Sequence, residues 1–394
     1  MRILFLVALL DAAGFGIIIP IFLYYALQLG ASPDQATMFF SIYPVALMLA
    51  APALGLMSDK YGRKPIMLLT LGASVIGYIT LGFAQNLLML AFARLIQGAA
   101  AGNMSVVQAY VADITDNESR AKGMGTIGAA TGLGFVIGPA LGAWLGGGSF
   151  ENTSLELAAF CSAGASLVAL LLVFFVLPES LDQEHRLENR NNKLRLNPFS
   201  SLPMALAKPA LLGFFVCAML FNIAGAFAEV ILPLWLKDKL LISGPSQLMF
   251  LFLCAGLVLS FTQAKLIGPI NKRLGEAKMF GLGAIGYAVA LILIALSGAI
   301  QSYPAVILSW CLAGVSMALF FTGIQSLVSQ NAEPHERGSV MGAFSAVGTL
   351  GRVIGPSLTG LIYVNIHPNA PFYLGAALLM IGLLINVIWQ KRVA

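Results

Sequence analysis

Four charged side chains lie inside long apolar runs of the sequence: Asp11, Arg94, Glu229 and Arg352. Ionisable groups are costly inside a bilayer, and they usually mark proton or ion pathways. A carboxyl shielded from water can bind and release a proton near neutral pH. A buried guanidinium keeps its charge, so it faces a cavity or a carboxylate. This pattern predicts a proton-handling role for Asp11 and Glu229.

Each of these residues also has a plainer interpretation. Asp11 is compatible with a hydrogen bond between two helices, and Glu229 with a place at the outer interface. The aliphatic part of the Arg94 side chain is long enough to carry its charged end to the outer membrane interface. Arg352 either faces the cavity and pairs with a carboxylate, or pairs at a cytoplasmic gate.

A charged, glycine-containing segment follows the second apolar run: Gly55-Leu-Met-Ser-Asp59-Lys60-Tyr-Gly62-Arg63-Lys64-Pro65. Gly55 permits close approach of a neighbouring backbone, and Gly62 permits a tight turn. Asp59 stands at a helix end, where it can accept hydrogen bonds from amides or a guanidinium. The matching segment of the second half carries Lys272 in place of the acid. Charge pairing at this segment is therefore predicted to be asymmetric.

The two halves of the chain repeat a pattern of small residues. Glycines four residues apart let two helices pack closely, and a proline bends its helix. An offset of 217 residues aligns Gln108 with Gln325, and it also aligns Gly134, Gly138 and Pro139 with Gly351, Gly355 and Pro356. Gly142 continues the glycine spacing of the first set. An offset of 211 aligns Asp11 with Asn222. Parallel repeats of this kind place a binding site near the midplane between the halves.

The composition excludes a water-soluble globular protein. Of 394 residues, 59% are hydrophobic and 10% are charged, whereas soluble domains carry about 25% charged residues. Twelve apolar runs are long enough to cross a bilayer, which takes roughly 20 residues each. We therefore predict an all-α polytopic membrane protein with twelve transmembrane helices in two pseudo-symmetric six-helix halves. The halves are residues 1–177 and 208–394, and a polar cytoplasmic linker at 178–207 joins them.

The positions of Lys and Arg predict the orientation of the chain. Most of the 22 basic residues fall in loops on one side, so both termini are expected in the cytoplasm and the chain in the inner membrane. The net charge of +5 is then explained by this bias, without nucleic acid. The three histidines lie apart in loops, and no metal site is expected.

These motifs resemble those of the major facilitator superfamily. The segment 55–65 resembles the family's signature after helix 2, Arg94-Leu-Ile-Gln97-Gly98 its helix 4 signature, and 134–142 its antiporter signature. Residues 10–142 are most similar to twelve-span drug:proton antiporters of the tetracycline-exporter type. Those exporters carry an acidic residue before a tyrosine in helix 3, where this chain has Gly77 before Tyr78. We therefore expect a substrate other than tetracycline.

The resemblance implies roles for individual residues. In this family the loop after helix 2 latches the inner gate, which implies a gate formed by Gly55, Asp59, Gly62, Arg63, Lys64, Asp113 and Arg120. Proton coupling is implied for Asp11, Arg94, Glu229 and Arg352. The helices that line the central cavity are expected to present Asp11, Gln97, Gln108, Asn222, Glu229 and Gln325.

The expected function is secondary active transport. The chain would export amphipathic drug-like small molecules in exchange for protons by alternating access, as a monomer. It would need no cofactor beyond the proton gradient. We do not expect an enzyme, because the sequence shows no pairing of a nucleophile with a base and no metal-binding cluster. Two alternatives are a proton-coupled symporter and a dedicated exporter of one metabolite or siderophore. A membrane sensor that does not transport is a third.

Overall fold

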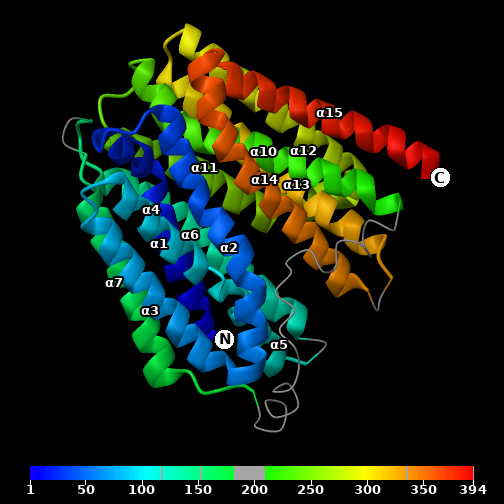
Figure 1. Cartoon of the computed structure of the whole chain (residues 1–394). Coiled ribbons are helices and arrows are strands. Elements are labelled where there is room, and N and C mark those ends of the chain that lie inside the picture. Colours follow the sequence, from blue (N-terminus) through cyan, green and yellow to red (C-terminus); the bar gives the residue numbers. More distant parts are fainter. Residues whose placement is uncertain (117–118, 151–152, 182–208, 334–335, 394) are drawn as a thin grey trace. The chain divides into compact units, whose positions relative to one another are not determined.

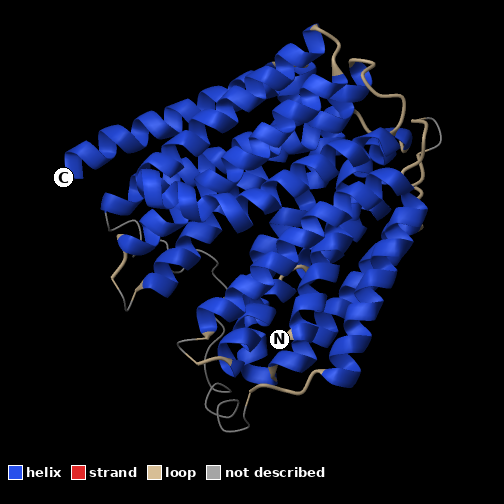
Figure 2. Ribbon diagram, turned by 180° about the vertical axis from the view of Figure 1, so that it is seen from behind, coloured by secondary structure: helices blue, strands red, loops and turns tan. Residues whose placement is uncertain are grey.

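The computed structural model of the chain describes residues 1–116, 119–150, 153–181, 209–333 and 336–393. Regular structure in these ranges is helical throughout, and short loops join the helices, as Figure 2 shows. The predicted all-α polytopic fold is confirmed.

The chain forms two compact units, Met1–Ala31 with Ile42–Pro198 and Ser32–Ser41 with Phe199–Ala394 (Figure 1). The helices up to the linker are α1 (Arg2–Gln28), α2 (Pro33–Tyr61), α3 (Arg63–Gly82), α4 (Leu87–Ala100), α5 (Asn103–Ile114), α6 (Arg120–Leu145) and α7 (Leu155–Val176). Those after it are α10 (Pro209–Asp238), η1 (Pro245–Gln247), α11 (Leu248–Phe261), η2 (Thr262–Leu266), α12 (Ile267–Ala299), α13 (Tyr303–Gln330), α14 (Arg337–Asn365) and α15 (Ala370–Val393). The predicted boundaries of the linker stay a prediction, because 182–208 lie outside the described residues.

Eleven continuous helical stretches in the described ranges are long and apolar enough to cross a membrane. One of them, Pro245–Ala299, runs for 55 residues, far more than a single crossing needs. Gly275 interrupts it with a φ of 74°, a conformation that glycine adopts without strain. Counted as two crossings, this stretch brings the total to the twelve that the sequence predicts.

The predicted fourth span is divided between α4 and α5. The amide of Ala101 donates to the Gln97 carbonyl at 2.9 Å, and the amide of Gly102 to the Ala99 carbonyl at 3.3 Å. This tight turn lies against α2, since a Cβ on Gly102 would come within 3.1 Å of the Ala51 Cα. The turn keeps the backbone bonded, so the two helices act as one interrupted span.

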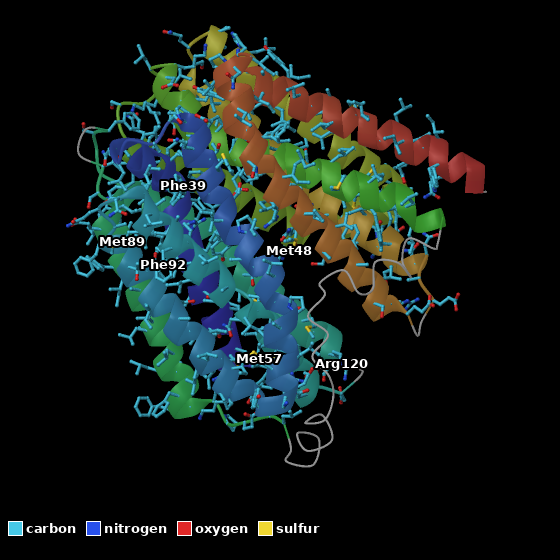
Figure 3. All side chains as sticks on the ribbon, viewed as in Figure 1. Phe39, Met48, Met57, Met89, Phe92 and Arg120 are labelled. Atoms are coloured by element: carbon cyan, nitrogen blue, oxygen red, sulfur yellow. The ribbon has the colours of Figure 1, made fainter. Side chains whose placement is uncertain are left out.

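In the first unit α1 is the central helix. It packs against α6 and α7, while α3 packs against α7 and α4. Its apolar side chains are buried on nearly all sides, as in a helix with no polar face. Large apolar side chains elsewhere face outward, and Phe92 on α4 is 56% exposed (Figure 3). Such exposure is typical of a surface that contacts lipid.

In the second unit α10 has the same central place. It packs against α14 and α15, and α12 packs along α13. Trp235, Phe215 and Phe221 of α10 are buried, and the Trp235 indole donates to Asn369 Oδ1 at 2.8 Å. The central helix of each unit therefore carries one of the in-membrane carboxyls that the sequence singled out, Asp11 on α1 and Glu229 on α10.

Candidate functional site

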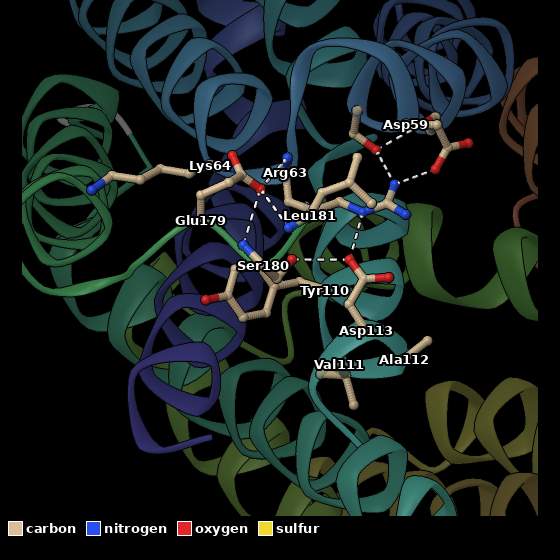
Figure 4. A network of polar contacts seen from close by, with 12 residues as sticks. Asp59, Arg63, Lys64, Tyr110, Val111, Ala112, Asp113, Glu179, Ser180 and Leu181 are labelled. Carbon is tan, nitrogen blue, oxygen red and sulfur yellow. Dashed lines mark hydrogen bonds and ion pairs between the residues drawn. The ribbon is translucent and has the colours of Figure 1, made fainter. Parts of the chain in front are cut away.

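Arg63, at the start of α3, is the hub of a charged network. Its Nη1 donates to Asp59 Oδ1 at 2.5 Å, and its Nε donates to Asp113 Oδ2 at 2.9 Å (Figure 4). Nη1 also bonds to the Ser58 hydroxyl at 2.7 Å. The Arg63 side chain is 8% exposed and that of Asp113 is 21% exposed. Charge-assisted bonds shielded in this way are stronger than surface ion pairs.

A second carboxylate, Glu179, caps the same helix. Its Oε1 accepts from the amide of Arg63 at 2.9 Å, and its Oε2 accepts from the amide of Lys64 at 3.2 Å. The amides at a helix start lack partners within the helix, and a carboxylate there also opposes the helix dipole favourably. Gly62 precedes this start with a φ of 104°, which turns the chain sharply out of α2.

The segment after α7 contributes two further bonds. The Ser180 hydroxyl donates to Asp113 Oδ2 at 2.9 Å, and the Tyr110 hydroxyl donates to the Pro178 carbonyl at 2.8 Å. The sequence analysis missed Glu179 and Ser180, because both fall in the segment that it predicted to be a polar linker. The available signal was an acid that directly follows an apolar run.

Three predicted gate residues lie outside this network of side chains. The Lys64 ammonium donates to the Phe174 carbonyl at 2.9 Å. Arg120 is exposed and donates to the Ala112 carbonyl at 3.5 Å, and it forms no ion pair with a described residue (Figure 3). A Cβ on Gly55 would have Ser105 Oγ as its nearest neighbour, at 3.9 Å, so no close backbone contact requires a glycine there.

Arg94 is 1% exposed and lies among aromatic rings. Its guanidinium carbon is 4.8 Å from the ring centroids of Phe22 and Tyr43 and 5.8 Å from that of Phe15. Nη1 donates to Gln97 Oε1 at 3.2 Å. Ring faces attract a cation electrostatically, and this attraction grows when water is excluded. The side chain is therefore held inside the unit and does not reach outward to an interface.

Gln97 ties this arginine to α3. Its amide nitrogen donates to the Gly77 carbonyl at 3.2 Å. A Cβ on Gly77 would lie 2.9 Å from Gln97 Cγ, so the glycine makes room for the glutamine. Asp11 and Arg94 both act electrostatically on the neighbouring Tyr78. Asp11 itself forms no hydrogen bond with a described residue, so the structure contains no helix-to-helix bond of the kind considered for it.

The second unit holds a related cluster. Arg352 Nε donates to Asn222 Oδ1 at 3.1 Å, and Asn222 Nδ2 donates to the Ala218 carbonyl at 2.8 Å. The second bond orients the amide so that its oxygen faces the arginine. Glu229 interacts electrostatically with Arg352 and with Tyr287. The cluster thus gathers a carboxyl, a guanidinium, an amide and a phenol from three helices.

The predicted packing glycines lie at crossings with the central helices. A Cβ on Gly138 of α6 would come within 2.6 Å of the Ala13 carbonyl oxygen of α1. A Cβ on Gly351 of α14 would come within 2.6 Å of the Met219 carbonyl oxygen of α10. A Cβ on Gly134, Gly142 or Gly355 would also come within 2.7 Å of these helices, and Pro139 and Pro356 lie in the same segments.

Two predicted cavity residues lie apart from both clusters. Gln108 on α5 and Gln325 on α13 are exposed, and neither bonds to a described residue. Gln97 and Asn222, by contrast, are buried and hold the arginines. A role in substrate binding stays a prediction for all four.

The chain is similar to known proteins along its whole length. It is 30% identical to the tetracycline resistance protein, class B, of Escherichia coli over 379 residues, which covers 93% of this chain and 89% of that protein. It is 26% identical to multidrug resistance protein 2 of Bacillus subtilis (strain 168), with 96% and 92% coverage. The crystal structure of the human organic anion transporter MFSD10 (TETRAN) has the same fold, with a TM-score of 0.71, 24% identity and 98% coverage of both chains.

A family model supports the same assignment. The model described as Major Facilitator Superfamily matches residues 4–266 and 244–393, nearly the whole chain. The repeated glycine pattern, the charged loop after α2 and the central carboxyl-bearing helices all fall within these matches. The chain is a member of the major facilitator superfamily.

Proposed function

We propose that the chain is a proton-coupled antiporter that exports amphipathic drug-like molecules by alternating access. The observation that carries this proposal is Glu229. Its side chain is exposed although its neighbours Ala228 and Val230 are 0% and 3% exposed, and Arg352 acts on it from α14. A carboxyl that is accessible within an apolar helix, with a cation nearby, can alternate between a neutral and an ion-paired state.

The proton would change the contact between α10 and α14. Ionised Glu229 attracts Arg352, which Asn222 holds in place. Protonated Glu229 carries no charge, so this attraction is lost and the arginine becomes available to other groups. A ligand can shift a conformational equilibrium only by its differential interaction with the two states. Proton binding and substrate binding at this cluster would supply such a difference.

The chain's setting follows from the same proposal. We place the protein in the inner membrane with both termini in the cytoplasm, which puts the Arg63 network on the cytoplasmic side. The energy source is the proton gradient, without a further cofactor, and one chain forms the pathway. The resistance proteins to which the chain is similar support efflux as the direction of transport.

Gly77 supports a substrate other than tetracycline. The resemblance to tetracycline exporters implies an acidic side chain at this place. Here a Cβ would already lie 2.9 Å from Gln97 Cγ and 3.3 Å from the backbone nitrogen of Gln97. An acidic side chain would therefore collide with α4 unless Gln97 moved, and that movement would release Arg94 from its amide partner.

Proton release driven by substrate in proteoliposomes tests the proposal, with a panel of cationic, neutral and anionic amphipathic compounds. The Glu229→Gln variant should still bind substrate but should not release protons when it does, because a neutral amide cannot exchange a proton. Glu276→Gln is the matched control, since Glu276 is half-buried next to the turn at Gly275 and accepts a hydrogen bond from Asn271, away from the Arg352 cluster. Coupling that persists unchanged in Glu229→Gln would contradict the proposal.

A further inference from the structure

A glycine-tyrosine pair recurs in the two units. Gly77-Tyr78 on α3 and Gly286-Tyr287 on α12 are 209 residues apart. Each glycine packs against the next helix of its unit, because a Cβ would come within 2.9 Å of Gln97 Cγ in the first pair and 2.5 Å of Ser316 Oγ in the second. The tyrosines are 5% and 4% exposed. The close packing of each glycine fixes the height of its tyrosine along the helix.

Each tyrosine hydroxyl lies against a glycine of the central helix. The Tyr78 oxygen is 3.4 Å from the position of a Cβ on Gly14, and the Tyr287 oxygen is 3.7 Å from that of a Cβ on Gly225. The Tyr287 ring is also held by Phe221, with ring centroids 4.8 Å apart. Within the described part of the chain neither hydroxyl forms a hydrogen bond, so each keeps its capacity to donate one and to accept others.

The carboxyls stand on opposite sides of these glycines. Glu229 follows Gly225 by four residues, whereas Asp11 precedes Gly14 by three. Residues three and four apart share a helix face, and side chains on a helix tilt toward its amino terminus. The Glu229 side chain therefore leans toward Gly225 and the Tyr287 hydroxyl. The Asp11 side chain leans away from Gly14 and Tyr78.

We propose that Tyr287 is a positioning residue for proton exchange at Glu229, which rests on the proposed function. The hydroxyl, which has no hydrogen bond in the described structure, would donate to the ionised carboxylate and accept from the protonated one, and so would hold the carboxyl in place through the exchange. A phenol can act in both directions, because it carries one donor and two acceptor lone pairs. Tyr78 has the equivalent place in the first unit, and Asp11 also acts on it, but Asp11 precedes the glycine of its helix and does not follow it.

Few other groups face Glu229. Arg352 acts on it from α14 and Tyr287 from α12. Helix α13 has no charged residue, and α15 has none between Ala370 and Gln390. On α10 itself the nearest charges are Lys237 and Asp238, two turns away, and Asp238 accepts a hydrogen bond from Tyr363. The pH response of Glu229 therefore depends mainly on one guanidinium and one phenol.

The pH profile of substrate-driven proton release by the full-length protein in proteoliposomes tests this inference. Tyr287→Phe keeps the ring and removes one bond to the charged carboxylate, so the profile midpoint should move to higher pH by about half to one unit. Tyr303→Phe is the control, since its hydroxyl bonds to the Gln247 carbonyl away from Glu229, and its midpoint should not move. Tyr78→Phe should move the midpoint by less than half as much as Tyr287→Phe.

A second variant guards against an unstable Tyr287→Phe protein. Glu229→Asp shortens the side chain and draws the carboxylate back from the hydroxyl, so Tyr287→Phe should shift the midpoint of this variant far less than it shifts that of the unsubstituted protein. An unchanged profile for Tyr287→Phe, or equal shifts for Tyr287→Phe and Tyr78→Phe, would overturn this inference and leave the proposed function standing. Unchanged coupling in Glu229→Gln would instead overturn the proposed function.

Discussion

At the scale of single residues, Arg94 is the clearest case of a charge held by unusual partners. Three aromatic rings and one amide surround a guanidinium that is 1% exposed. A planar guanidinium stacks on rings and keeps its charge when desolvated, whereas an ammonium is more strongly hydrated and makes no planar contact. The cage therefore selects arginine over lysine by its planar shape and its weaker hydration.

A double-mutant cycle between Arg94 and Phe22 measures this contact. Arg94→Lys should lower the stability of the detergent-solubilised protein by about 1–3 kcal/mol, because the rings and the Gln97 amide contact a planar guanidinium that lysine lacks. The coupling with Phe22→Leu should be about 1 kcal/mol. Lys60 and Tyr61 are the control pair and should couple far less, since Lys60 is half-buried, Tyr61 is exposed, and the Lys60 Nζ lies 5.6 Å from the ring centroid. Equal coupling in the two cycles would rule out a special contribution of the cage.

The sequence predicted some site residues better than others. Arg94 and Glu229 are conspicuous because a charge in an apolar run is rare, and the structure gives Arg94 a cage of rings with one amide and Glu229 the nearby charge of Arg352. Glu179 and Tyr287 escaped notice, since an acid beside a linker and a tyrosine in a helix are ordinary. Their significance depends on partners that lie far away in the sequence, as Glu179 does from Arg63 across 116 residues.

At the scale of helices, the crossing of α6 over α1 depends on glycine. A Cβ on Gly142 would overlap the Ile17 carbonyl group and lie 2.8 Å from the Ile17 Cα, whereas a Cβ on Gly128 of the same helix would meet nothing within 4 Å. The backbone of α1 cannot move aside easily, because α7 packs against it as well. The two glycines thus offer a matched comparison within one helix.

Gly142→Ala and Gly128→Ala should have opposite effects on stability. Gly142→Ala forces two backbones apart and should cost about 1–3 kcal/mol. Gly128→Ala should be neutral or should stabilise by up to about 1 kcal/mol, because alanine favours a helix over glycine. Thermal unfolding in detergent measures both. A tolerated Gly142→Ala would mean that the crossing is looser than the structure describes.

Helix type and order could be predicted from the sequence, while interruptions within helices could not. Apolar runs of suitable length identify spans, because a helix bonds its own backbone N–H and C=O groups to one another where no water is present. The break between Ala100 and Asn103 has no proline to announce it. It depends on the contact of Gly102 with α2, which is a tertiary feature.

At the scale of the whole molecule, the backbone is repeated but the charges are not. Gly62 and Gly275, which match at an offset of 213, both have positive φ, at 104° and 74°. The first turn leads into the Arg63 network. Near the second, Lys272 and Arg273 form no ion pair with a described residue. The predicted asymmetry of charge pairing therefore agrees with the arrangement of the described residues.

This asymmetry predicts unequal effects of matched substitutions. Asp59→Asn removes one of the two carboxylates that pair with Arg63, so only Asp113 remains to hold the guanidinium. This variant should reduce transport in proteoliposomes several-fold. Lys272→Asn, at the equivalent place in the second unit, should change the rate little. Equal losses in the two variants would indicate that the second loop carries its own latch.

The cap that Glu179 places on α3 has a consequence for the order of synthesis. Ribosomes deliver the chain from its amino terminus, so the first amides of α3 emerge 116 residues before the carboxylate that satisfies them. Water or headgroups must bind these amides until α7 is complete. The charged network around Arg63 is then completed only after α7, the last described helix of that unit, has been made.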